Sequence, residues 1–244
     1  MADVFLALMR SLASLRQGRI WLYVLAPALF SLVLWIALAV FGLGWLIDWL
    51  MGHPPMTLLI GWGLAWLATL LAYTGAWMAI FACAYLTASL IAAVVIMPLM
   101  LKQLSETDYP DVAAMGQDSF VNATVHSVFA AFLFIAGWLL TLPLWIIPGL
   151  SLILPLLLMA WLNRRTFAYD ALSLHATDSE WRSLSLQHKS PLFMLGLLMA
   201  LLAHLPIIGL IVPAIAALSF VHYGLESLRR LRGGAIVTIE GERL

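Results

Sequence analysis

The densest polar cluster in the sequence follows a long apolar segment. Asn163, Arg164 and Arg165 stand at its end, and Tyr169 and Asp170 come about one helical turn later. Guanidinium groups donate forked, charge-assisted hydrogen bonds that match the oxygens of a carboxylate, phosphate or sulfate. We therefore expect Arg164 and Arg165 to receive an oxyanion, with Asp170 orienting them. The alternative for the same residues is an ordinary ion pair that anchors the chain at the membrane surface.

A second set of titratable side chains stands near the C-terminus. His222, Glu226 and Arg230 are four residues apart, so on a helix they share one face, and Glu226 and Arg230 form a favourable pair. Titratable groups within a membrane are functional candidates, so this stripe predicts either a proton relay or an interfacial polar face. His204, beside Pro206, is expected to bond a carbonyl that the proline frees, and it is a further candidate for a solute pathway.

Motifs of enzymes and metal sites are absent from the sequence. It contains no phosphate-binding glycine loop, no metalloprotease His-Glu pair and no serine nucleophile elbow. The remaining histidines lack metal-ligand spacing, and the single cysteine, Cys83, lies in an apolar run without a disulfide partner. We therefore predict that the chain is not an enzyme and that it holds neither a cofactor nor a metal.

The composition identifies the solvent that the fold requires. Of 244 residues, 64% are hydrophobic and 10% are charged, whereas about a quarter of the residues of a soluble domain are charged. The formal net charge is zero, so no general attraction to nucleic acid is expected. Eleven tryptophans suit the two membrane–water interfaces. The sequence therefore predicts an integral membrane protein whose main partner is the lipid bilayer.

Hydropathy predicts a single all-α membrane domain. In chain order we expect an interfacial helix (1–19), a first transmembrane helix (20–47), and a second transmembrane helix with its continuation (56–101). A cytoplasmic segment (102–127), a first hairpin (128–162), a cytoplasmic loop (163–191), a second hairpin (192–228) and a basic tail (229–244) follow. The interfacial helix is amphipathic and is expected to turn its polar side to water, with Asp3, Arg10, Ser14 and Arg16.

The second transmembrane segment is about twice as long as one crossing requires. We therefore expect a crossing over residues 57–82 and a bent or buried continuation to Pro98. Small residues recur every three or four positions along it and predict a face for close helix packing: Gly61, Ala65, Ala68, Ala72, Ala76 and Ala79.

Prolines and glycines interrupt both later apolar blocks. They are Pro143, Pro148, Gly149 and Pro155 in the first block, and Pro206, Gly209 and Pro213 in the second. Arms of about 15 residues reach about 22 Å, less than the hydrocarbon core of about 30 Å. Re-entrant hairpins, which penetrate the bilayer only partly, therefore fit better than pairs of full crossings.

The basic residues indicate the orientation. All 12 Lys and Arg lie before the first span, after the second, between the hairpins or at the C-terminus. None lies in the turn at residues 48–56 or at a hairpin tip, so the positive-inside rule predicts cytoplasmic termini in a bacterial inner membrane. Pairs of full crossings would give the same orientation.

Several short motifs occur in a recognisable order. They are Val24-Leu-Ala-Pro27, Ile147-Pro148-Gly149, Ala160-Trp161-Leu-Asn163 with Tyr169-Asp170 downstream, and Leu205-Pro206-Ile-Ile-Gly209 before Pro213. From about Gly18 to Arg232, the chain resembles the CysZ-type sulfate permeases and related etoposide-induced membrane proteins. The resemblance implies two long transmembrane helices, two helix pairs that penetrate part of the bilayer, a homo-oligomer, and inward conduction of sulfate.

The chain differs from those sulfate permeases at two places. Trp21 and Leu22 stand where the permeases carry a basic pair, and residues 97–100 replace their Asn-Gly turn. These differences leave the solute open. We expect ATP-independent transport of a small solute such as an inorganic anion, and a non-transport membrane scaffold or assembly factor is the alternative.

Overall fold

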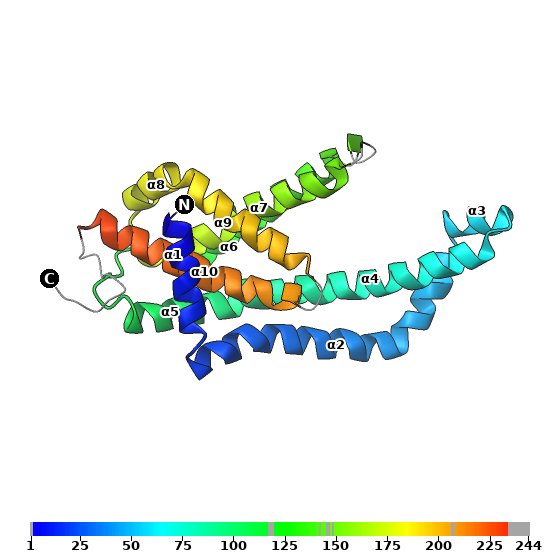
Figure 1. The fold of residues 1–244 in the computed structure, drawn as a ribbon, viewed down its shortest axis with the longest axis horizontal. Coiled ribbons are helices and arrows are strands. Elements are labelled where there is room, and N and C mark those ends of the chain that lie inside the picture. Colours follow the sequence, from blue (N-terminus) through cyan, green and yellow to red (C-terminus); the bar gives the residue numbers. More distant parts are fainter. Residues whose placement is uncertain are drawn as a thin grey trace.

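The described part of the chain is helical throughout its regular structure. The computed structural model describes residues 2–116, 120–141, 143–144, 147, 149–205 and 208–233. In chain order the helices are α1 (Ala2–Ser14), α2 (Gly18–Met51), α3 (Met56–Gly61), α4 (Ala65–Ile91), the π-helical turn η1 (Ala92–Ile96), α5 (Met97–Thr107), α6 (Phe120–Thr141), α7 (Leu150–Asp170), α8 (Asp178–Gln187), α9 (Lys189–Ala203) and α10 (Ile208–Leu231) (Figure 1). The predicted all-α class is confirmed.

Among the described residues, three helical stretches are long and apolar enough to cross a membrane. They are α2, the continuous run from α4 to α5, and α10. The first two correspond to the predicted transmembrane segments. The third was expected as one short arm of a hairpin, but α10 has 24 residues and is about 36 Å long.

Close packing of α2 on α4 rests on small residues. Ala72 and Ala76 are fully buried and form a cluster with Ile47 of α2. The buried row continues at intervals of four residues, with Ala68, Ala72, Ala76, Ile80, Ala84, Ala88 and Ala92. Half of the predicted small-residue face is therefore confirmed. Gly61, Ala65 and Ala79 are exposed because they lie outside this row of four-residue steps.

The turn between α2 and α4 lies at the far end of the molecule (Figure 1). The short helix α3 follows residues 52–55, and Gly63 then adopts a φ of 78°, which lets the chain reverse into α4. The crossing predicted from residue 57 therefore begins at Ala65. Four exposed tryptophans surround this end, as expected at a membrane–water interface: Trp45, Trp49, Trp62 and Trp66.

Of the two predicted continuations after α4, bent or buried, the structure has the buried one, with a local widening of the helix. The π-helical turn η1 connects α4 to α5, and the helix continues over 43 residues, or about 64 Å. Pro98, which has no N–H to donate to the preceding turn, directly follows this widened segment. Because Met97, Met100, Leu101 and Leu104 are buried in the main core, α5 stays attached to the bundle.

Two helical hairpins form where they were predicted, but most of their arms are longer than expected. Helices α6 and α7 have 22 and 21 residues, about 33 and 32 Å, whereas α9 has the expected 15. Helix α7 continues through Pro155 and α10 through Pro213, so neither proline ends a helix. The predicted breaks at Pro148 and Pro206 lie outside the described residues.

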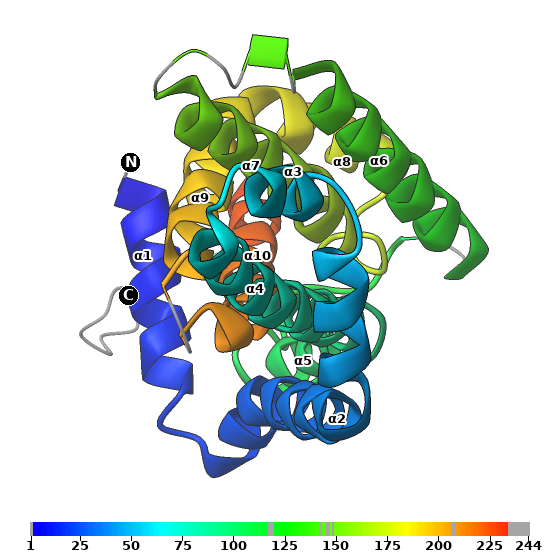
Figure 2. The ribbon, with the colours of Figure 1, turned by 90° about the vertical axis from the view of Figure 1, so that its right-hand side faces the viewer.

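Helix α10 forms the centre of the bundle (Figure 2). It packs against α1, α2, α4, η1, α5, α7, α8 and α9. Its buried side chains include Phe220 and Leu225, and also the polar His222, Glu226 and Arg229. A helix in this position exposes little surface to lipid, so its polar residues must find partners within the protein.

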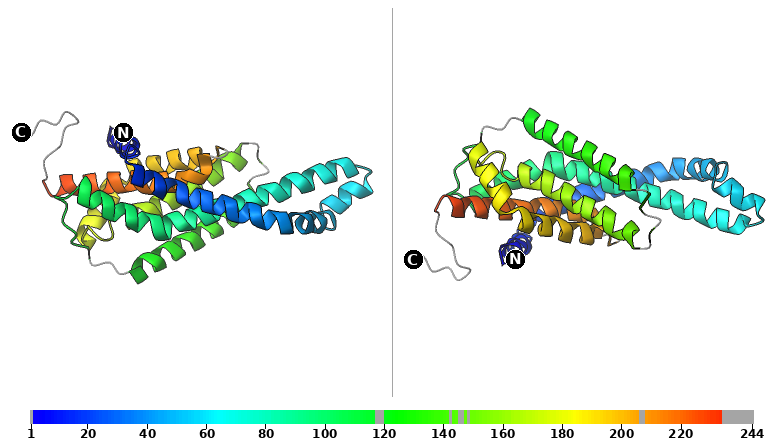
Figure 3. Two further views of the ribbon diagram at one scale, coloured as in Figure 1. Left: turned by 90° about the horizontal axis from the view of Figure 1, so that it is seen from below. Right: turned by 90° about the horizontal axis from the view of Figure 1, so that it is seen from above.

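The three helix pairs extend to different distances along the long axis of the molecule. The pair α2–α4, with α3 at its tip, projects well past the tips of the hairpins α6–α7 and α9–α10 (Figure 3). Helices α1, α5 and α8 lie together at the opposite end, near the C-terminal end of α10 (Figure 1).

Candidate functional site

The two adjacent arginines of the predicted polar cluster line one cavity. This cavity of about 220 Å³ lies between α7, α8 and α9 and is lined by Trp161, Arg164, Arg165, Ala168, Trp181, Ser185 and Leu192. At about 30 Å³ per water molecule it has room for roughly seven waters, or for a small hydrated ion. The structure thus brings Arg164 and Arg165 together with two indole rings and a hydroxyl group.

Each of these arginines lies close to the charge of the other. Burial, and then the positive charge of Arg165, lowers the pKa of Arg164. The Arg165 guanidinium lies over the Trp161 ring, with 5.9 Å between its Cζ and the ring centroid. Such a contact orients the cation without removing its charge. The cavity therefore presents two positive groups to any anion that enters it.

Asn163, Tyr169 and Asp170 act around the cavity rather than in it. The Asn163 Nδ2 group donates a hydrogen bond of 3.2 Å to the Gly196 carbonyl, which joins α7 to α9. The Tyr169 ring meets the Trp181 ring edge-on at 5.3 Å and supports one cavity wall. Asp170 is the last residue of α7 and is not among the residues that line the cavity.

Helix α8 is held at both ends of its first turn. Thr177 and Glu180 form a capping box, and Glu180 also pairs with Arg232, with bonds of 2.8 and 2.9 Å to its two carboxylate oxygens. Arg232, together with the cap, lowers the pKa of Glu180 to about 2. The carboxylate therefore stays ionised at any physiological pH, and the pair is lost only as the pH falls toward that value. This pairing fixes Trp181 and Ser185 as the outer wall of the cavity.

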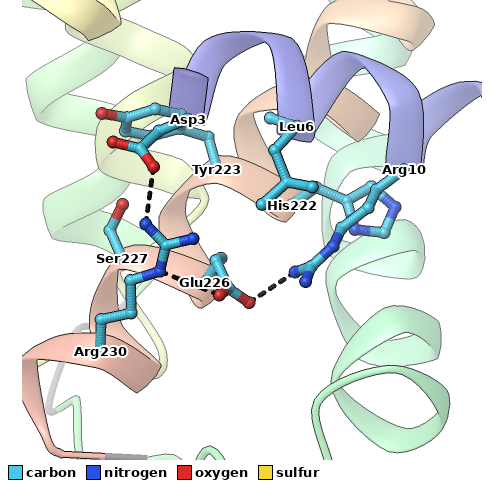
Figure 4. Close-up of a pocket in the computed structure, with 9 residues that line it drawn as sticks. Asp3, Leu6, Arg10, His222, Tyr223, Glu226, Ser227 and Arg230 are labelled. Atoms are coloured by element: carbon cyan, nitrogen blue, oxygen red, sulfur yellow. Dashed lines mark hydrogen bonds and ion pairs between the residues drawn. The ribbon is translucent and has the colours of Figure 1, made fainter. Parts of the chain in front are cut away.

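The second predicted stripe is confirmed as one face of α10. Glu226 accepts a hydrogen bond of 3.1 Å from Arg230 Nε, the pair that the spacing predicts. Each member of the stripe also contacts α1: Ser14 lies 2.8 Å from His222. Arg10 lies 2.5 Å from Glu226, and Asp3 lies 2.6 Å from Arg230 (Figure 4). The prediction of a polar side that faces water was therefore wrong for Arg10 and Ser14, which face α10, whereas Arg16 is exposed and Asp3 is partly exposed.

Three residues of this network were missed by sequence reasoning. Arg229 is buried and pairs with Asp111, and its Cζ lies 4.8 Å from the centre of the Tyr109 ring. The Tyr109 hydroxyl accepts a hydrogen bond of 3.0 Å from Arg10 and lies 3.1 Å from His222 Nδ1. Burial raises the pKa of Tyr109 to about 12, so this hydroxyl stays protonated. The adjacent basic residues at the end of the last apolar block were the only signal for Arg229.

A larger cavity lies beside this network. It has a volume of about 370 Å³ between α1, the chain after α5, and α10, and its lining residues are Arg10, Ala13, Ser14, Gln17, Asp108, Tyr109 and Arg229. Helix α1 therefore supplies one whole wall of this cavity.

His204 lies away from both large cavities. Its Nδ1 is 2.7 Å from the Ala200 carbonyl oxygen at the end of α9, so it does lie within hydrogen-bond distance of a backbone carbonyl. Pro206, which was expected to free that carbonyl, lies outside the described residues. Across the described ranges, no group of three or more His, Cys, Asp or Glu could hold a metal ion.

Comparison with known proteins places the chain in a family. No curated protein and no solved structure matches it significantly. The family model described as "Sulfate transporter CysZ/Etoposide-induced protein 2.4" matches residues 7–213, which include α7, its two arginines and the first turns of α10. The chain therefore belongs to this family, and it is a multi-pass membrane protein.

Proposed function

We propose that this protein moves a small inorganic anion across the membrane without ATP. The observation that carries the proposal is the cavity that Arg164 and Arg165 line together, with no carboxylate among its lining residues in the described part of the chain. Two guanidinium groups at one site suit an anion with several oxygens, because each offers forked donors. The transporters in the family's description support the same class of solute.

The cavity suits passage better than permanent binding. Its walls combine the two arginines with the Ser185 hydroxyl and the rings of Trp161 and Trp181, so few groups hold the anion directly. A conduction site must bind strongly enough to admit an ion and weakly enough to release it. Because the sequence contains no phosphate-binding loop, the proposed flux follows the anion gradient or a coupled proton gradient.

The proposal includes an orientation in a bacterial inner membrane. Both termini lie in the cytoplasm, and the two hairpins enter from that side, end within the bilayer and frame the pathway in a homo-oligomer. Two observations support this arrangement: the hairpin tips fall short of the tip of the pair α2–α4 (Figure 3), and every basic residue lies in a segment expected on one side.

Labelling from outside the cell tests the depth of the second hairpin. In a Cys83→Ala background, we expect Trp62→Cys, at the exposed tip of α3, to react with an impermeant maleimide. Ile208→Cys, at the exposed start of α10, should react at a small fraction of that rate because it lies within the bilayer. Equal labelling at the two positions would show full crossings and overturn the re-entrant arrangement.

Uptake into proteoliposomes tests the function. We expect radiolabelled sulfate to enter vesicles that contain the protein, with no ATP present, several times faster than it enters empty vesicles. Phosphate in excess shows whether another tetrahedral oxyanion competes. If a folded and correctly oriented protein takes up no sulfate, sulfate transport is excluded and the membrane scaffold becomes the better interpretation.

A further inference from the structure

Helix α1 is attached to α10 by a regular series of polar contacts. Along α1 the partners are Asp3, Arg10 and Ser14, and along α10 they are Arg230, Glu226 and His222. Figure 4 shows the first two of these contacts. The two helices cross steeply (Figure 1) and are joined at three points. The stripe on α10 that a relay would use is occupied as the docking face for α1.

Apolar contact is divided between the two sides of this helix. Its buried residues are Val4, Ala7, Ser11 and Ser14, and Leu8 packs against the main core. On the other side, Phe5 is 63% exposed, Leu12 is 56% exposed and Met9 is 40% exposed. A helix with this distribution is held to the protein by charge as well as by apolar contact, and its outer face is attracted to the membrane surface.

The helix forms one side of the cavity of about 370 Å³, which stays open to its surroundings while α1 is docked. Arg10, Ala13 and Ser14 of α1 form one wall, and Tyr109 and Arg229 form part of the opposite side. We infer that α1 is a movable lid, which narrows this cavity when its polar residues dock on α10 and widens it when they leave. This inference does not depend on which solute, if any, the protein carries.

Glu226 makes the central contact that holds α1 on α10. Its carboxylate contacts Arg10, Arg230 and Arg229, at 2.5, 3.1 and 3.6 Å, and of these only Arg10 belongs to α1. When Arg10 leaves, the carboxylate keeps two cationic partners on its own helix, so opening does not strand a buried charge. The Arg10 side chain is 22% exposed and can exchange the carboxylate for water. The short connection at residues 15–17 links α1 to α2 and can serve as the hinge.

Thiol labelling beneath the helix measures the opening. Ala7 is 3% exposed and lies against α10, so Ala7→Cys in the full-length Cys83→Ala protein should react slowly with a water-soluble maleimide. Arg10→Gln or Glu226→Gln removes the central contact, and each should raise the reaction rate at least tenfold. The double variant should label no faster than the faster single variant, because both changes break the same contact.

Two controls separate opening from general loosening. Glu180→Gln breaks a comparably close arginine pair that does not involve α1, so it should leave the rate at Ala7→Cys unchanged. Ala171→Cys, fully buried beyond the end of α7, should stay unreactive in every variant. If Arg10→Gln, the milder change at a partly exposed side chain, leaves labelling at Ala7→Cys unchanged, the lid is excluded. Equal acceleration at Ala171→Cys would also exclude it, because the whole end of the bundle would then be loosened.

Discussion

Replacing both Arg164 and Arg165 by Ala is expected to reduce sulfate uptake to the level of empty vesicles. The two guanidinium groups share one cavity whose lining residues, in the described part of the chain, include no carboxylate, so both groups are available to the anion. A hydrogen bond to a charged group contributes about 1.5–3 kcal/mol. Even at the lower value, losing two such bonds weakens anion binding roughly a hundredfold.

The matched control for this double variant is Arg182→Ala. Arg182 is an exposed residue of α8 and does not line the cavity, so its loss removes a positive charge from the same segment without touching the site. Uptake should then remain close to that of the unmodified protein. Unchanged uptake in the double alanine variant, with normal insertion, would show that the arginines only anchor the chain and would move the anion pathway elsewhere.

Gly196→Ala is expected to separate α7 from α9 and to disturb the same cavity from a distance. A Cβ atom at Gly196 would lie 2.5 Å from the Ala160 carbonyl oxygen and 3.4 Å from the Arg164 backbone nitrogen. Both neighbours are backbone atoms, so the two helices must move apart. Overpacking of this kind costs about 1–3 kcal/mol of unfolding free energy. We expect a lower melting temperature in detergent and slower uptake in vesicles.

Gly44→Ala provides the control for that substitution. Gly44 lies within α2 and a Cβ atom there would meet nothing within 4 Å. Since Ala is favoured over Gly by up to about 1 kcal/mol in a helix, this variant should melt at the same temperature or higher. If Gly196→Ala melted like Gly44→Ala, the close approach of α7 and α9 at this residue would be disproved.

Local sequence patterns were sufficient for the class of fold and for much of its organisation. An excess of apolar residues and the two long uncharged segments predicted α2 and α4, because a bilayer accepts only backbones that satisfy their own hydrogen bonds. The spacing of His222, Glu226 and Arg230 predicted a shared face, and the structure shows it. Arg164 and Arg165 were predicted to bind an anion because charged groups are rare in such a chain, and the structure places both at one cavity.

Helix lengths at the hairpins depended on tertiary packing. Pro155 and Pro213 suggested that a helix is interrupted at each of them, yet α7 continues through Pro155 and α10 through Pro213. A proline removes one hydrogen bond, and neighbouring helices and local adjustment can compensate for that loss inside a packed bundle. Whether they do so depends on contacts that are distant in the chain, such as those of α10 with the helices around it.

The sequence by itself determined that this is an all-helical membrane protein, and it identified the arginine pair and the stripe on the last helix, because composition and helical period are local properties. Only the tertiary structure decided which way α1 turns. Its polar residues suit water as well as protein, and Arg10 faces inward because Glu226, 216 residues later, supplies the opposite charge. The two cavities with arginine walls also depend on the tertiary structure. Each is lined by residues from three regions of the chain, and no local sequence pattern connects those regions.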